Sequence, residues 1–141
     1  MDIRPITDSY AVSPQIAPED MAAIKAAGYV AIINNRPDAE IPPEWQATAM
    51  EAAAKEAGLD FVVNPVTHAG LNMDMVATQM ETLQNAGGPV LAYCASGTRS
   101  SIVWSLGMAK DMSAEEIMQA TGNAGYDLSG LVPQLNAIAG S

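Results

Sequence analysis

The chain has 141 residues, of which 49% are hydrophobic, and a formal net charge of −10. This length and apolar fraction predict a single domain over residues 1–141 with its own hydrophobic core. The negative charge argues against nucleic acid and membrane surfaces as partners, because both attract basic proteins. With one cysteine and one histidine no zinc site is expected, and no cofactor is predicted. The single cysteine, the lack of a membrane-length apolar run and the lack of a secretory signal predict a cytoplasmic protein.

Strand-like and helix-like segments alternate along the chain. Apolar runs bounded by turn residues predict the strands, and capping residues and terminal glycines predict the helix ends. The predicted elements are, in chain order, strand 9–12, helix 17–27, strand 29–33, helix 43–57, strand 59–64, helix 72–85, strand 90–93, helix 99–110, a helix opened by the capping box at 113–116, and helix 128–139.

This alternation predicts an α/β fold with a central, mainly parallel sheet of about four strands joined by right-handed crossovers. Ligands of such sheets bind beyond the carboxyl ends of the strands. We therefore expect four loops to meet at one edge of the sheet: residues 13–15, 34–38, 66–70 and the loop that starts at Cys94.

The Cys94 loop is the strongest candidate for a catalytic site. The sequence Cys94-Ala95-Ser96-Gly97-Thr98-Arg99-Ser100 joins a predicted strand to a predicted helix. Backbone N–H groups at a helix N-terminus stabilise an anion or a thiolate, and the planar guanidinium of Arg99 fits an oxyanion. Cys94, Arg99 and Ser100 are thus candidate catalytic residues, and Ala95, Ser96, Gly97 and Thr98 are candidate anion-binding residues. A lone cysteine is often a small buried hydrophobe, but such a cysteine needs no Ser-Gly-Thr-Arg sequence after it.

Other polar residues in the expected loops have two interpretations each. Arg36 is a candidate second anion ligand, or it forms a surface ion pair with Asp38 or Glu40. Gln15 is a candidate substrate contact or a turn residue. Ser100 is a candidate donor to the Cys94 thiolate or a cap of the following helix.

Four stretches of the chain resemble one known family. They are Val12–Gln15, Val30–Glu40, Pro65–Thr67 and Tyr93–Ser100. The chain resembles the phosphatase-like domain of the β-lactamase hydrolase-like family, which occurs alone and fused to metallo-β-lactamase-type hydrolases. The resemblance implies a three-layer tyrosine-phosphatase-like fold, with helices on both faces of the sheet.

The Cys94 loop departs from the tyrosine-phosphatase pattern. Tyr93 stands where those enzymes have a histidine, and four residues rather than five separate Cys94 from Arg99. The spacing Cys-x-x-Gly-x-Arg matches the active-site loop of rhodanese-type sulfurtransferases. A shorter loop forms a smaller cradle, which favours a single sulfur atom over a phosphoryl group.

A phosphatase also needs a general acid to protonate its leaving group. The loop at residues 65–74 has no aspartate at the position that the resemblance implies, and His68 and Asp74 are the candidate substitutes. For His68 the favoured interpretation is an ordinary loop residue rather than an acid, because no neighbour in the sequence orients it. Sulfur transfer between thiols needs less acid catalysis, because a thiolate is a good leaving group.

These observations predict a cysteine-dependent group-transfer enzyme. The favoured hypothesis is a sulfurtransferase that carries sulfane sulfur as a Cys94 persulfide, between a small sulfur donor and a thiol acceptor. The first alternative is a tyrosine or dual-specificity phosphatase that forms a cysteinyl phosphate and acts on a phosphorylated substrate. The second alternative is a non-catalytic module that binds an anion or a phosphoprotein. The resemblance also implies a functional link to a metallo-β-lactamase-type hydrolase.

Overall fold

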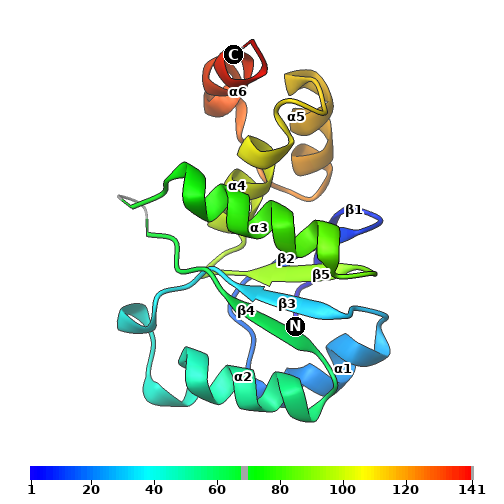
Figure 1. Cartoon of the computed structure of the whole chain (residues 1–141), viewed down its shortest axis with the longest axis vertical. Helices are drawn as coiled ribbons and strands as arrows, with labels where there is room; N and C mark the ends of the chain where they lie inside the picture. The colour runs from blue at the N-terminus through cyan, green and yellow to red at the C-terminus, as the bar shows by residue number, and fades with distance from the viewer. Residues whose placement is uncertain (68–69, 141) are drawn as a thin grey trace.

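A five-stranded sheet forms the centre of the molecule (Figure 1). The computed structural model describes residues 1–67 and 70–140. The strands lie in the order β1-β2-β5-β3-β4. Their bounds are β1 Arg4–Thr7, β2 Tyr10–Ser13, β3 Ala31–Asn34, β4 Asp60–Val63 and β5 Val90–Tyr93. The pairs β2–β5, β5–β3 and β3–β4 are parallel, so the predicted mainly parallel α/β sheet is confirmed.

The strand β1 was not predicted from the sequence. It pairs antiparallel with β2, with Arg4 opposite Val12, and lies at the edge of the sheet. The apolar pattern of this strand is weak, because Ile6 is the one residue of Arg4–Thr7 that is buried. Pro5 also argues against a central strand, because proline has no backbone N–H to donate to a neighbouring strand and is therefore found mainly in edge strands. The sheet therefore has one strand more than the four expected.

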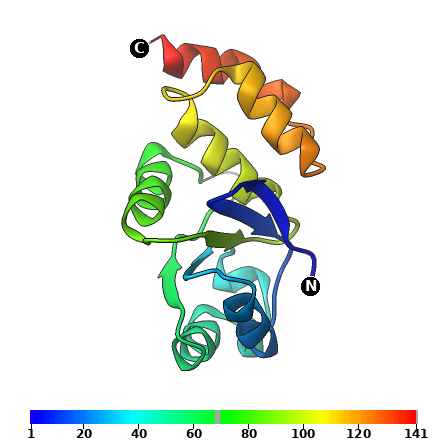
Figure 2. The same ribbon diagram turned by 90° about the vertical axis from the view of Figure 1, so that its right-hand side faces the viewer.

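Helices cover both faces of the sheet, which gives the three layers that the resemblance implied (Figure 2). The helices α1 Met21–Ala26 and α2 Ala47–Glu56 cover one face. The helices α3 Met73–Asn85 and α4 Thr98–Met108 cover the other face. The helices α5 Ala114–Asn123 and α6 Val132–Ala139 pack beyond α4, at the end of the molecule that holds the C-terminus.

Three helices begin later than predicted because a short 3₁₀ turn precedes each of them. These turns are Pro18–Asp20 before α1, Pro43–Trp45 before α2 and Ser129–Leu131 before α6. Proline suits the first position of such a turn, because its missing N–H would have no partner there. The predicted capping box at Ser113 is present: its hydroxyl accepts from the Glu116 N–H, and the Glu116 carboxylate accepts from the Ser113 N–H.

Two hydrophobic cores, one on each face, hold the helices to the sheet. On the α1/α2 face, Ile32 and Leu91 of the sheet pack in one cluster with Met50 of α2. On the α3/α4 face, Tyr10 stacks on Trp104 of α4 with the ring centroids 6.0 Å apart. Both aromatic side chains are nearly fully buried, which fixes α4 on the sheet. The position of α4 matters for function because this helix begins immediately after the Cys94 loop.

The carboxyl ends of the parallel strands are in register. Tyr93 at the end of β5 pairs with Ser13 at the end of β2 and with Asn34 at the end of β3, and Asn34 pairs with Val63 of β4. The loops after these strands therefore converge at one edge, as the parallel topology predicts. In the described residues, no helix is long and apolar enough to cross a membrane.

Candidate functional site

Cys94 lies at the centre of the carboxyl edge of the sheet. It follows β5, whose residues are all buried, and its own side chain is 0% exposed. The backbone N–H of Gly97 donates to the Cys94 sulfur, with 3.1 Å between nitrogen and Sγ. Gly97 has φ of 95°, a left-handed conformation that favours glycine, and α4 begins at the next residue. The predicted strand, loop and helix around this cysteine are thus confirmed.

Hydrogen bonds to loop carbonyls set the direction of the loop N–H groups. The Gln15 N–H donates to the Ala95 carbonyl over 3.3 Å, and the Tyr126 hydroxyl donates to the Ser96 carbonyl over 2.9 Å. In a trans peptide the carbonyl and the following N–H point in opposite directions. The carbonyls of Ala95 and Ser96 are held by these outer partners, so the N–H groups of Ser96 and Gly97 face the other way.

Arg99 is buried and bound to a carboxylate. Its guanidinium donates from Nη1 to Glu40 Oε2 over 2.9 Å, from Nη2 to Glu40 Oε1 over 2.7 Å, and from Nη1 to the Val66 carbonyl over 2.7 Å. The hydrogen bonds to Glu40 raise the pKa of Arg99, and the neighbouring Cys94 sulfur adds to this effect. The hydrogen bond from Arg99 lowers the pKa of Glu40, and Arg36 contributes more weakly in the same direction. The sequence suggests Glu40 as an ion-pair partner of Arg36, and it does not predict the bidentate contact of Glu40 with Arg99.

Arg36 and Gln15 lie at the rim of the same site. Arg36 Nε lies 3.3 Å from Glu40 Oε1, and its Nη1 donates to Gln15 Oε1 over 3.2 Å. Gln15 also contacts the Cys94 loop, because its backbone N–H donates to the Ala95 carbonyl. Arg36 therefore forms the predicted ion pair with Glu40, and its role as an anion ligand stays a prediction.

Ser100 is buried inside the first turn of α4. Gly97, not Ser100, is the N-terminal cap of this helix, so the interpretation of Ser100 as a cap is wrong. The Ser100 hydroxyl accepts a hydrogen bond from Asn35 Nδ2 over 2.9 Å. Asn35 in turn accepts from Asn64 Nδ2 over 3.3 Å. A hydroxyl both accepts and donates, so this hydrogen bond does not use the Ser100 proton, and donation from Ser100 to Cys94 stays a prediction.

Asn35 and Asn64 were not identified from the sequence as site residues. Both are buried and both directly follow parallel strands, β3 and β4. A pair of asparagines after a strand is ordinarily read as a turn, and Asn35 lay within the predicted turn at 34–38. The signal that distinguishes them is their position at the carboxyl edge of neighbouring strands.

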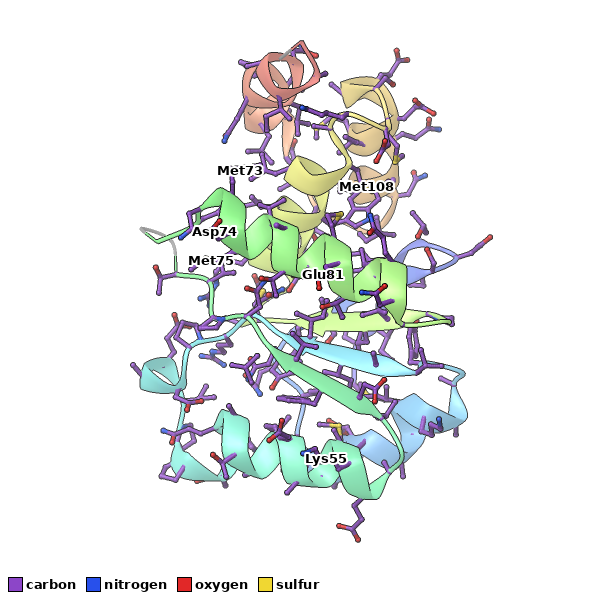
Figure 3. All side chains as sticks on the ribbon, viewed as in Figure 1. Lys55, Met73, Asp74, Met75, Glu81 and Met108 are labelled. Atoms are coloured by element: carbon purple, nitrogen blue, oxygen red, sulfur yellow. The ribbon has the colours of Figure 1, made fainter. Side chains whose placement is uncertain are left out.

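The structure describes one of the two candidate general acids, Asp74. His68 lies outside the described residues. Asp74 lies in the first turn of α3, where it is exposed (Figure 3). Within residues 1–67 and 70–140 no hydrogen bond or ion pair joins the Asp74 side chain to the Cys94 loop. That His68 or Asp74 acts as a general acid stays a prediction.

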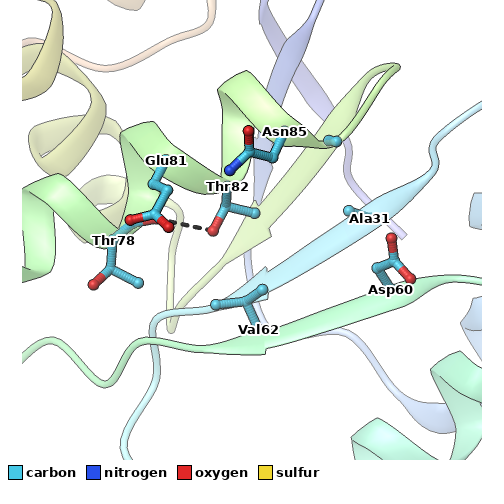
Figure 4. Close-up of a pocket in the computed structure, with 8 residues that line it drawn as sticks. Ala31, Asp60, Val62, Thr78, Glu81, Thr82 and Asn85 are labelled. Atoms are coloured by element: carbon cyan, nitrogen blue, oxygen red, sulfur yellow. Dashed lines mark hydrogen bonds between the residues drawn. The ribbon is translucent and has the colours of Figure 1, made fainter.

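A separate cavity of about 530 Å³ lies between α3 and the β3–β4 edge of the sheet (Figure 4). Ala31 and Asp60, the first residues of β3 and β4, line it. The cavity therefore reaches the amino ends of these strands, opposite the Cys94 loop. Asp60 and Glu81 give it two carboxylates, which disfavours an anionic ligand. In the described residues no group of three or more histidine, cysteine or acidic side chains is placed to hold a metal ion.

The profile of the "Beta-lactamase hydrolase-like protein, phosphatase-like domain" family matches residues 2–111. The chain belongs to this family. The curated Beta-lactamase hydrolase-like protein of Xylella fastidiosa is 33% identical over 138 residues, which are 96% of this chain and 32% of that protein. The chain thus spans about a third of the length of the curated relatives that it matches.

Solved structures confirm the tyrosine-phosphatase-like fold. A candidate phosphatase from Neisseria meningitidis superposes with a TM-score of 0.85 at 31% identity, over 98% of this chain and 99% of that one. The kinase-associated phosphatase superposes with a TM-score of 0.70 at 14% identity, over 97% of this chain and 90% of that one. At the latter identity the likeness concerns the fold.

The lowered pKa of Glu40 leads to a prediction about acid stability. A carboxylate with a lowered pKa stabilises the fold fully above its ordinary pKa and loses this effect as the pH falls through the lowered value. Between about pH 5 and pH 3, the unfolding midpoint in urea should therefore fall more steeply for wild type than for Glu40→Gln. Glu44→Gln removes an equal charge from an exposed position and controls for a general charge effect. Equal slopes for wild type and Glu40→Gln would contradict the importance of the Glu40–Arg99 pair.

Proposed function

We propose that this chain is a sulfurtransferase that holds sulfane sulfur on Cys94 as a persulfide. The observation that carries the proposal is the compact loop in which the Gly97 N–H lies 3.1 Å from the Cys94 sulfur, with four residues between Cys94 and Arg99. Backbone N–H groups and a guanidinium stabilise a thiolate and equally the anion of a persulfide.

The chemistry is an exchange of sulfur without net oxidation. The Cys94 thiolate attacks the outer sulfur of a donor such as thiosulfate, the donor S–S bond breaks, and sulfite leaves with the electron pair. The product is a Cys94 persulfide anion. An acceptor thiolate or cyanide then attacks the terminal sulfur, the protein S–S bond breaks, and the Cys94 thiolate is regenerated. No proton has to be delivered to an alkoxide, so no general acid is required.

Three features favour sulfur over a phosphoryl group. The loop is one residue shorter than the phosphatase loop, so it surrounds a smaller volume. The Glu40 carboxylate lies on the Arg99 guanidinium, where it would repel a phosphoryl dianion more than a persulfide with a single charge. The aspartate of the loop at 65–74 is Asp74, which lies exposed on the first turn of α3. A phosphatase needs a general acid at its leaving group, whereas sulfur transfer does not.

The second candidate function is a phosphatase with a cysteinyl-phosphate intermediate, and the comparisons favour it. The Neisseria meningitidis protein is a candidate phosphatase and is similar over nearly the whole chain. The kinase-associated phosphatase has a catalytic-site cysteine on a similar fold. Arg99 and the loop N–H groups would then bind the phosphoryl oxygens, as they would bind the sulfur in the first proposal.

The partners of the proposed reaction are a small sulfur donor and a thiol acceptor. We expect Arg36 and Gln15, which are hydrogen-bonded to each other, to contact the donor or acceptor as it enters. The curated relatives are about three times longer than this chain and carry a hydrolase-like name, so we also propose a functional link to a hydrolase of the metallo-β-lactamase type.

Persulfide formation is the direct test. Intact protein incubated with thiosulfate or a persulfide donor should gain the mass of one sulfur atom, and dithiothreitol should remove it, because the S–S bond on Cys94 is reducible. Mass spectrometry of wild type and Cys94→Ser measures this, and the variant should gain nothing. If wild type takes up no sulfur but releases a burst of phenol from an aryl phosphate, the phosphatase is the correct function. If neither reaction occurs while phosphate or a phosphopeptide still binds, the chain is a binding module.

Arg99 and Arg36 should differ in their tolerance of lysine. Arg99→Lys keeps the charge but loses the planar fork of donors, and we expect kcat/KM to fall by about 10²-fold or more. Arg36→Lys at the rim should cost no more than about fivefold, as for an exposed ion pair. Kinetics of both variants with the substrate that turns over measures the difference. Equal, mild losses would show that Arg99 does not orient the transferred group.

A further inference from the structure

Tyr126 lies outside the matched family segment and yet contacts the catalytic loop. It follows α5, in the turn after Asn123, whereas the family profile ends at residue 111. Its hydroxyl donates to the Ser96 carbonyl over 2.9 Å. The Tyr126 side chain is 7% exposed, so this hydrogen bond is partly shielded from water. A hydrogen bond there has more effect than on an open surface.

The hydrogen bond acts on the peptide group that also carries the Gly97 N–H. The Ser96 carbonyl and the Gly97 N–H belong to one planar unit, and the described chain contains no cis peptide. The two groups therefore point in opposite directions. With its carbonyl held by Tyr126, this peptide directs its N–H toward the Cys94 sulfur, 3.1 Å away.

The Tyr126 ring is itself held in place on its other side. The Arg4 guanidinium of β1 lies over the ring, 5.4 Å from its centroid, and also donates to the Ala124 carbonyl over 3.4 Å. The Tyr126 N–H donates to the Thr121 carbonyl over 2.9 Å. A Cβ added at Gly97 would overlap the Tyr126 hydroxyl, so the loop and the ring fit each other closely. Burial raises the pKa of Tyr126, and the phenol keeps its proton for donation at neutral pH.

We propose that Tyr126 is a positioning residue that fixes the Ser96–Gly97 peptide so that its N–H faces the Cys94 thiolate. Without the phenol the peptide is free to rotate, because no other donor to the Ser96 carbonyl is present among the described residues. The Cys94 anion then loses a fixed donor in the step where charge is on its sulfur. This inference depends on Cys94 as the nucleophile, and it holds for either transferred group.

Tyr126→Phe tests the proposal, because it keeps the ring and removes one oxygen atom. The Gly97 amide resonance, assigned in ¹⁵N-labelled wild type and verified with Cys94→Ser, should move upfield or broaden in Tyr126→Phe. For the substrate that turns over, kcat should fall by about tenfold, the size of one hydrogen bond to a charged group, with KM within about twofold of wild type. Tyr29→Phe removes a phenol at the opposite edge of the sheet, before β3, and is the matched control.

An unmoved Gly97 amide in Tyr126→Phe would overturn the proposal. A fall in kcat that comes together with a large fall in the urea unfolding midpoint would indicate a general loss of stability, and this result would overturn the proposal too. The amide measurement needs no substrate. If Gly97 responds while neither sulfur transfer nor phosphate hydrolysis is found, the positioning role stands and the proposed function fails, so the two failures are distinguishable.

Discussion

The hydrogen bond from the Gly97 N–H to the Cys94 sulfur is the contact on which the candidate site depends. It requires a peptide with its N–H turned inward, a left-handed residue at position 97 and a helix that starts at position 98. Each requirement is met by a different part of the fold. The Tyr10–Trp104 stack fixes α4, the loop after β2 supplies Gln15 for the Ala95 carbonyl, and the segment after α5 supplies Tyr126. The surroundings of Cys94, the proposed nucleophile, are thus set by elements that are far apart in the sequence.

The charge balance of the candidate site bears on the proposal that this acidic protein binds an anionic group. With six basic residues against 16 acidic ones, the chain has few cations to spare. Arg99 and Arg36 are both concentrated at the carboxyl edge of the sheet, and Glu40 lies between them. Glu40 orients the Arg99 guanidinium but also partly neutralises it. Such a site suits a group of low charge, which agrees with a persulfide as the proposed intermediate.

Much of this arrangement was predictable from local patterns. The four parallel strands, the helices between them and the Cys94 loop all follow from apolar runs, capping residues and the strand-loop-helix order. The edge strand β1 was missed because it buries one apolar residue and contains Pro5. Glu40, Asn35, Asn64 and Tyr126 were missed because their roles arise from contacts between residues 29 to 65 positions apart, which no local pattern encodes. The role of Ser100 as a cap was wrong because the helix begins one turn earlier than this interpretation required.

The choice between sulfur and phosphate is tested most directly by turnover of both substrates by one preparation of the protein. We propose measuring kcat/KM for thiosulfate with cyanide and for an aryl phosphate, with Cys94→Ser as the control. A compact cradle with a carboxylate on Arg99 predicts Cys94-dependent formation of thiocyanate and a much lower kcat/KM for the phosphate. Cys94-dependent hydrolysis of the phosphate with no thiocyanate would contradict the sulfurtransferase proposal.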